Sequence, residues 1–164
     1  MDSLSKTARS KNMRAIRGKG MKPELTVRRI VHRLGFRYRL HRAGLPGKPD
    51  LVFSSRRKVI FIHGCFWHQH AKSRCVDSRI PKSNVAYWRK KLAGNQQRDR
   101  KNLAALRKAG WKALVVWECE IKNERRVTER IVKFLSGDST TRPLLSEHPP
   151  QYHAGEGENH QREK

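Results

Sequence analysis

Thirteen consecutive residues of this chain bring together side chains that can bind metals, transfer protons and stack on nucleic-acid bases. The chemically capable residues are His63, Cys65, Phe66, Trp67, His68, His70 and Cys75. They follow an apolar run, Val59–Ile62, that predicts a buried strand. Solvent-exposed loops rarely combine metal-binding, proton-transferring and large aromatic side chains. A site that hydrolyses phosphodiesters beside a structural zinc ion, with aromatic side chains directed at base pairs, would use each of them.

Cysteines and one histidine of this loop are candidate zinc ligands. Cys65, His70 and Cys75 lie in the loop, and Cys119 follows the last predicted strand. A Cys3His set is a closed structural site, which would tie the long loop to the sheet. Three cysteines cannot all pair within one chain, and a reducing compartment disfavours disulfides. Two alternatives remain open, namely free thiols and a zinc site in which another histidine replaces His70.

If zinc takes His70, then His63 and His68 are available for proton transfer. Histidine is mostly neutral near pH 7 and can accept or donate a proton there. One of the two could activate a water for attack on a phosphodiester. The other could orient that water or assist departure of the 3′ oxygen. The aromatic neighbours Phe66 and Trp67 are consecutive, so on an extended loop both cannot easily be buried. Aromatics exposed on a basic surface can stack on bases or wedge between them.

Carboxylates are scarce in the first 117 residues, which hold five of them. Asp50 begins a predicted strand and His63 ends a neighbouring one, and adjacent strands lie about 4.8 Å apart. A carboxylate, a main-chain carbonyl and waters suit Mg²⁺, although Asp50 could also be a turn residue after Pro49. Asp99 falls on the apolar stripe of a predicted helix, so its side chain should face inward. This position does not distinguish a structural ion pair from a role at the metal. Glu24 stands in the first turn of a predicted helix, where the helix dipole favours a carboxylate.

The charge of the chain points to a polyanionic partner. There are 38 Lys and Arg against 14 Asp and Glu, a formal net charge of +24, and 30 of the basic residues precede residue 118. Binding to phosphates relieves the repulsion among these positive charges and releases counterions from the nucleic acid. Nucleic acid is therefore the expected partner. A membrane surface is disfavoured because no lysine-rich helix with a wide apolar face occurs. Because there is no apolar run of about twenty residues and no signal-peptide pattern, we expect a cytoplasmic protein.

The hydrophobic periodicity predicts an α/β domain. The expected elements are a helix from Pro23 to Gly35, strands over Phe36–Leu40, Asp50–Phe53 and Val59–Ile62, a long helix over Val85–Lys108, a buried strand over Trp111–Trp117 and a last helix through Val127 and Leu135. The first three strands can form a meander, and the fourth can join them by a crossover. The result is a small mixed sheet flanked by helices. Residues 1–20 are predicted to be a basic arm, 21–136 the folded domain and 137–164 a disordered tail.

Taken together, these residues resemble the very short patch repair endonuclease family. Three blocks carry the resemblance: Arg9–Ile16, Leu45–Asp50 and Val59–His70, with support from Asn95–Arg100 and Val115–Cys119. The His-Gly-Cys-Phe-Trp-His run is highly specific, and the similarity covers roughly residues 6 to 136. The resemblance implies a restriction-endonuclease-like fold. It implies a nick in one DNA strand on the 5′ side of the thymine of a T:G mismatch, a lesion that arises when 5-methylcytosine deaminates.

The resemblance also implies roles for individual residues. Asp50 would bind Mg²⁺ together with the carbonyl of Ile62, and His68 would be the general base. Glu24, His63 and Asp99 would hold waters around the metal or the attacking water. The remaining roles are zinc binding by Cys65, His70, Cys75 and Cys119, and DNA wedging by Met13, Phe66 and Trp67. Phe61-Ile62-His63 stands where restriction nucleases carry Glu-x-Lys, so we expect a site that does not rely on a lysine.

Three hypotheses of function follow. The leading one is a Mg²⁺-dependent, mismatch-directed nicking endonuclease whose cleavage requires Asp50. The second is a non-catalytic, zinc-stabilised DNA-binding module, which needs neither Asp50 nor Mg²⁺. The third is a nuclease of another class, with the histidines around a catalytic metal. We expect a monomer, because one mismatch has no two-fold symmetry. Recruitment by mismatch-repair proteins is left open by the sequence.

Overall fold

The computed structural model describes residues 21–40, 42–70 and 75–137. The predicted arm, including Met13, therefore lies outside the described residues, as does the predicted tail after Gly137. None of the described helices is both long enough and apolar enough to span a bilayer.

A four-stranded mixed sheet lies at the centre of the described part. Its strands, in spatial order, are β1 (Arg39–Leu40), β2 (Leu51–Phe53), β3 (Lys58–His63) and β4 (Lys112–Trp117). The first three form an antiparallel meander, and β4 pairs parallel to β3 after the crossover helix α4 (Val85–Lys108). The register places Ile60 opposite Leu51 and His63 opposite Trp117. This arrangement confirms the predicted small mixed sheet and its crossover.

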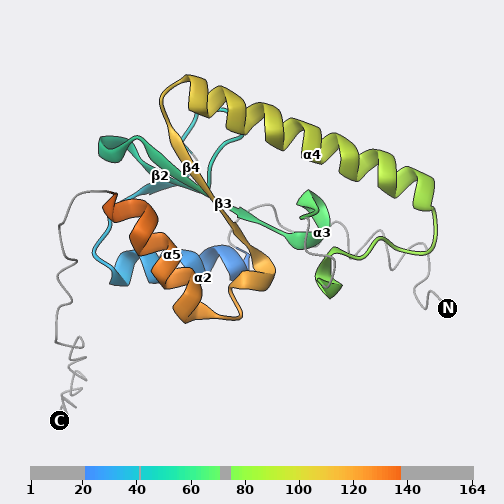
Figure 1. Ribbon diagram of the computed structural model, residues 1–164, viewed down its shortest axis with the longest axis horizontal. Coiled ribbons are helices and arrows are strands. Elements are labelled where there is room, and N and C mark those ends of the chain that lie inside the picture. Colours follow the sequence, from blue (N-terminus) through green and yellow to red (C-terminus); the bar gives the residue numbers. More distant parts are fainter. Residues whose placement is uncertain (1–20, 41, 71–74, 138–164) are drawn as a thin grey trace, which may run out of the picture.

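Helices cover both faces of the sheet. Figure 1 shows α2 (Lys22–Arg33) and α5 (Glu124–Ser136) on one face and α4 on the other. The side chains of β3 alternate accordingly, since Ile60 packs with the α2 and α5 core whereas Val59 and Phe61 pack with Leu106 of α4. Period-2 alternation between two buried faces explains why the central positions of the strand, Val59 to Ile62, are all apolar. The prediction of a strand buried on both faces is confirmed for Val59 to Phe61.

Local signals at the helix ends agree with the observed boundaries. α2 has proline in its first turn, and Gly35 follows it with a φ of +79°, which only glycine adopts without strain. α5 begins after Asn123, whose side chain accepts a hydrogen bond from the Arg126 N–H at 3.0 Å. The Asn123 contact gives one of the first N–H groups of α5 a hydrogen-bond partner. The predicted helix over Val85–Lys108 matches α4 residue for residue.

Three consecutive cations in the turn between β2 and β3 bind the C-terminal ends of two helices. The guanidinium of Arg57 donates to the carbonyls of Ala109 and Gly110 after α4. Arg56 and Lys58 both donate to the carbonyl of Leu135 in α5, at 3.4 and 3.2 Å. Carbonyls in the last turn of a helix have no partner within the helix, so positive charge there is stabilising. One turn thus joins α4, α5 and the sheet.

Three predictions about elements need correction. The strand expected over Phe36–Leu40 pairs only at Arg39–Leu40, both of which are exposed at the sheet edge. β4 is not fully buried, because it is the other edge of the sheet and only its Val116 is buried. The segment after β3 is not simply a loop, since it contains the short helix α3 (Cys65–His68) and the 3-10 turn η2 (Val76–Ser78). Short apolar-polar patterns do not show whether a strand has one neighbour or two.

Candidate active site and metal centre

A cavity of about 200 Å³ opens beside the ends of β2 and β3, against α4. Asp50 immediately precedes β2, and Ile62 and His63 end β3. Antiparallel pairing of these strands brings the start of one beside the end of the other. The lining residues are Gly47, Lys48, Asp50, Phe61, Ile62, His63, His68, Asp99, Asn102 and Leu103. Four of the five predicted catalytic residues therefore meet at one cavity.

The Asp50 carboxylate is fixed to the neighbouring strand. Its Oδ2 accepts a hydrogen bond of 2.7 Å from the Ile62 N–H. This contact orients the carboxylate towards the same cavity that Ile62 lines. Carboxylate and main-chain carbonyl oxygens are the hard ligands that Mg²⁺ prefers, so the donor set at Asp50 and Ile62 fits such an ion.

His68 and Asp99 form a hydrogen-bonded pair between α3 and α4. The Nδ1 of His68 lies 2.6 Å from Oδ2 of Asp99. Asp99 is largely buried, with 18% of its side chain exposed, so the contact is shielded from water. A carboxylate at Nδ1 holds the neutral imidazole as the tautomer with its proton on that nitrogen. The Nε2 atom of His68 is then the proton acceptor, as a general base requires.

His63 lies parallel to His68 within the same cavity. Their ring centroids are 3.9 Å apart with an angle of 11° between planes, and Trp117 meets His63 edge-on. Burial, together with the neighbouring His68, lowers the pKa of His63 to about 4, against an opposing effect of Asp99. His63 is therefore neutral at pH 7 and can orient a water without adding charge.

A second cluster consists of three cysteines and one histidine. The possible ligand atoms of Cys65, His70, Cys75 and Cys119 all lie within 4.8 Å of one another. Cys119 follows β4 in the 3-10 turn η3 (Glu118–Glu120), and its Sγ is 3.6 Å from Nε2 of His70. Three sulfurs and one imidazole at this separation match a tetrahedral zinc site in donor type and number. The structure thus brings together all four residues predicted to share a metal, and His70, not another histidine, joins the cysteines.

Burial favours the neutral thiol of Cys65 over its thiolate. Burial raises the pKa of the Cys65 thiol to about 12. A thiolate in this place needs compensating positive charge, which a divalent metal supplies. The ring of His70 also packs edge-on against Trp117, which in turn contacts His63. One aromatic side chain therefore separates the metal cluster from the catalytic cavity.

Phe66 and Trp67 belong to an aromatic group that also includes residues of α4. They lie on α3, so the expectation that they occupy an extended loop is wrong. Each contacts Trp88 of α4 edge-on, with centroids 5.2 and 6.2 Å apart, and Tyr87 packs on Trp88 at 5.2 Å. Phe66 and Trp67 are half-buried and Tyr87 is exposed. Trp88 was not singled out from the sequence, because an aromatic on a predicted helix resembles an ordinary core residue.

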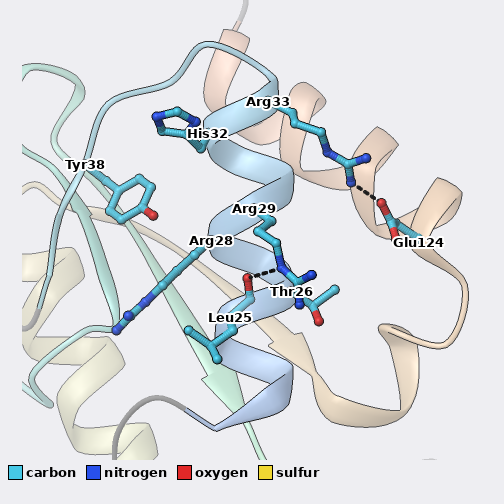
Figure 2. A pocket seen from close by; sticks show the side chains of 8 residues that line it. All are labelled: Leu25, Thr26, Arg28, Arg29, His32, Arg33, Tyr38 and Glu124. Atoms are coloured by element: carbon cyan, nitrogen blue, oxygen red, sulfur yellow. Dashed lines mark hydrogen bonds and ion pairs between the residues drawn. The ribbon is translucent and has the colours of Figure 1, made fainter. Parts of the chain in front are cut away.

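Glu24, the fifth predicted catalytic residue, is not among the described residues that line the cavity beside Asp50. It lies in the first turn of α2, 5% exposed, and its carboxylate pairs with Arg28 one turn later. A larger hollow of about 710 Å³ lies beside α2 and contains none of the predicted catalytic residues. Figure 2 shows Arg33 pairing with Glu124 of α5 across this hollow, and Arg29 donating to the carbonyl of Leu25.

Comparison with known proteins gives the class of this chain: it is a DNA endonuclease. The family model described as DNA mismatch endonuclease Vsr matches residues 1–74. The chain is 44% identical over 134 residues to the type II nicking enzyme V.XorIIP of Xanthomonas oryzae, an alignment covering 82% of this chain and 96% of that protein. It is 35% identical to the DNA mismatch endonuclease Vsr of Escherichia coli over 145 residues, 85% of this chain and 91% of that protein.

The chain belongs to the Vsr family. A further relative, the type II nicking enzyme V.NmeAIP of Neisseria meningitidis, is 45% identical over 130 residues, which are 79% of this chain and 91% of that protein. Among solved structures, the catalytic domain of the homing endonuclease I-Bth0305I is similar with a TM-score of 0.49 and 18% identity. That alignment covers 70% of this chain and 94% of the other.

Proposed function

We propose that this protein is a mismatch endonuclease that nicks one DNA strand on the 5′ side of the thymine in a T:G mismatch. The observation that carries the proposal is the stacked pair of His63 and His68, with His68 fixed by Asp99, in one cavity with Asp50. The relatives named as nicking enzymes, and the one named as a mismatch endonuclease, support the reaction and the substrate.

In the proposed reaction, His68 removes a proton from a water through Nε2. The water oxygen forms a bond to phosphorus while the bond between phosphorus and the 3′ oxygen breaks, and solvent returns a proton to that oxygen. Asp99 stabilises the imidazolium of His68 while it carries the proton. The ring of His63 is stacked on that of His68, and neutral His63 orients the same water. The products are a 3′ hydroxyl and a 5′ phosphate at the nick.

Two metal ions have a place in the proposal. Mg²⁺ would be held by the carboxylate of Asp50 and the carbonyl of Ile62, and when bound it supplies a Lewis acid for the phosphate and the departing oxygen. Zn²⁺ would be held by Cys65, His70, Cys75 and Cys119, and its role is structural because all four positions are filled by protein. Glu24 pairs with Arg28 and is not among the described residues that line the cavity, so the proposed reaction assigns it no step.

Recognition of the mismatch is assigned to the aromatic group and the arm. Phe66 and Trp67 project from α3, whose last residue is His68, so a base step contacting them would place its backbone near the cavity. Apolar side chains inserted between base pairs unstack them at a cost of a few kcal/mol, which is least at a mismatch. Met13 is proposed to insert from the minor groove.

The test is strand-specific nicking of a labelled duplex that holds one T:G mismatch, compared with its T:A twin, with Mg²⁺ present. A single nick beside the mismatched thymine, lost with EDTA and restored by added Mg²⁺, is the expected result. Asp50→Ala should abolish the nick and leave DNA binding nearly intact. Equal cutting of both duplexes would remove mismatch recognition from the proposal, and no cutting in several sequence contexts would favour a non-catalytic zinc-stabilised DNA-binding module.

A nuclease of another class, with a catalytic metal ligated by histidine, is the third hypothesis, and the Cys65→Ser variant separates it. His70 shares one cluster with Cys65, Cys75 and Cys119, whose possible ligand atoms lie within 4.8 Å of one another, so a catalytic metal held there would involve Cys65 directly. It predicts that Cys65→Ser abolishes cleavage in a protein that still folds. Our proposal instead predicts that Cys65→Ser acts through loss of zinc and of folded structure.

A further inference from the structure

The catalytic cavity is lined by one lysine that has no assigned role. Lys48 is the only lysine or arginine among the described residues that line the cavity, which also holds the carboxylates of Asp50 and Asp99. A phosphodiester entering this cavity therefore meets two acids, and the lysine is the protein group that can offset their repulsion.

The backbone at Lys48 adopts a conformation that lysine rarely adopts. Its φ is +50°, in the left-handed region where glycine or asparagine is less strained. The residue closes a tight turn, since its N–H donates to the carbonyl of Leu45 at 3.2 Å. Strained backbone of this kind persists where the surroundings hold it, and it is concentrated at functional sites.

The surroundings that hold the turn are part of α4. A Cβ added to Gly47 would lie 3.0 to 3.2 Å from side-chain atoms of Asn102, so the turn touches the helix and has no room for a side chain there. Pro49, on the other side of Lys48, is buried. The turn is therefore fixed between α4 and the start of β2, and it presents Lys48 at the cavity two residues before Asp50.

The side chain of Lys48 has no structural partner that would explain this placement. Within the described part of the chain it forms no ion pair, hydrogen bond or cation-π contact. It is exposed, and its ammonium is free to meet an incoming anion. A strained turn that holds an unpaired cation at the rim of an acidic cavity is a ligand-binding arrangement and adds nothing to the core.

We infer that the Lys48 ammonium binds a non-bridging oxygen of the scissile phosphate and stabilises the negative charge that develops there as water attacks. The inference rests on the proposed nicking function and adds a catalytic residue to it. It also replaces the expectation that the site works without a lysine: the cation comes from the turn before Asp50, not from β3. A lysine here acts as a point charge and does not need the bidentate geometry of arginine.

Single-turnover nicking of the Lys48→Met variant is the test. We expect the rate to fall about 100-fold, as it does when one donor to a developing oxyanion is removed, while the dissociation constant for an uncut duplex rises only about fivefold. Lys48→Arg should recover most of the rate because it restores the charge. The matched control is Lys112→Met, an exposed lysine at the far end of β4, which should nick like the wild type.

A binding cycle provides a readout that does not depend on turnover. In metal-free buffer, a duplex with an uncharged methylphosphonate at the linkage 5′ of the thymine is compared with the normal duplex, for the wild type and for Lys48→Met. We expect the wild type to lose at least about fivefold more affinity than the variant on removal of that charge, since only the wild type has an ammonium to meet it. Equal losses would overturn the contact.

The outcomes separate the inference from the function on which it rests. Lys48→Met that nicks within threefold of wild type, or that loses binding in proportion to its rate, overturns the role of Lys48 and leaves the nicking function in place. A wild-type protein that nicks no duplex overturns the proposed function and this inference with it. Lys48→Met that loses both nicking and the charge-dependent affinity, next to an unaffected Lys112→Met, supports the inference.

Discussion

Oδ2 of Asp99 lies 2.6 Å from Nδ1 of His68, and this contact attaches the middle of α4 to the last residue of α3. Two neighbours on the same helix add to the attachment. The Asn95 amide donates to the carbonyl of Trp67, and the Gln96 amide donates to the carbonyl of Gln69, both at 2.9 Å. One stretch of α4 thus fixes the backbone of α3 on either side of His68 and the His68 ring itself.

Asp99→Asn tests whether this contact serves catalysis. An amide at this position can donate to Nδ1 and so favour the tautomer whose proton is on Nε2, which leaves no acceptor for the water proton. It also cannot stabilise the imidazolium. We expect the nicking rate to fall roughly 10²- to 10⁴-fold with little loss of DNA affinity.

The measurement is the single-turnover rate between pH 5.5 and 9, since a change of general base alters the shape of the profile. Gln96→Ala is the matched control, because it removes a contact of α3 with α4 but not the partner of His68. An Asp99→Asn rate within tenfold of the wild type, with an unchanged profile, would show that Asp99 has only a structural role.

Much of this site was predictable because each of its residues has a restricted chemistry and a position set by an element boundary. Asp50 and His63 stand next to apolar strands, so pairing of those strands had to bring them to one edge. Asp99 interrupts an apolar stripe, which predicts a carboxylate directed inward. The four candidate zinc ligands gather because three share one segment and Cys119 follows β4, the strand parallel to β3.

The parts that were missed depend on tertiary contacts that have no local signal. Trp88 is one aromatic among the polar residues of α4, and only packing against α3 shows that it joins Phe66 and Trp67. Lys48 is one of 38 basic residues, so charge alone could not distinguish it. Its distinguishing features are a positive φ and a place at the cavity, and both become visible only when the turn is folded against Asn102.

The cysteine cluster predicts one tightly bound zinc ion per chain. Cys119→Ser should lose most of this metal, because it removes the ligand that joins the 65–75 segment to the end of β4. The free energy of unfolding should fall by at least about 3 kcal/mol, since structural zinc contributes roughly 10 kcal/mol or more in small domains. Metal content by mass spectrometry and unfolding in urea measure the two effects.

His63→Gln is the control for zinc binding, because His63 lies outside the cluster and the variant should keep the metal. A wild-type protein purified without stoichiometric metal, or a Cys119→Ser protein that retains it, would contradict the assignment. Cobalt substitution gives an independent readout, since the visible spectrum of the cobalt form reports tetrahedral thiolate ligation.

His63 makes the stability of the fold depend on pH. Burial lowers the pKa of His63 from 6.5 to about 4, so the unfolded chain binds a proton in this window that the folded chain excludes. Its contribution to stability is therefore complete above pH 6.5 and is lost as the pH falls towards 4. A shift of this size corresponds to about 3 kcal/mol.

Urea unfolding of the wild type and of His63→Gln between pH 7.5 and 4.5 measures this contribution. The difference in unfolding free energy between the two proteins should change by up to about 3 kcal/mol as the pH falls, with the wild type losing more. Zinc content is followed in the same samples, so that metal release at low pH is not mistaken for protonation. Parallel pH dependences would show that His63 is not responsible.

Lys58 predicts a loss of stability that is independent of both metal sites. Its buried ammonium donates to the carbonyl of Leu135 at 3.2 Å and lies 5.6 Å from the ring centre of Phe134 at the end of α5. Lys58→Met keeps the aliphatic volume but removes the charge, and it leaves that carbonyl with the longer contact to Arg56. We expect the unfolding free energy to fall by about 1 to 2 kcal/mol, from the lost hydrogen bond and the uncompensated helix dipole.

The matched control is Lys112→Met, since Lys112 pairs directly with Lys58 across β3 and β4 but is exposed. It should change the unfolding free energy by less than about 0.5 kcal/mol. Amide hydrogen exchange adds a local readout, because removal of the Lys58 contact should speed exchange in the last turn of α5 and not in α2. If both variants unfold alike, or if exchange in α5 is unchanged, the ammonium of Lys58 does not anchor this helix. A loss confined to Lys58→Met, with faster exchange near Leu135, would show that the turn between β2 and β3 holds α5 in place through charge.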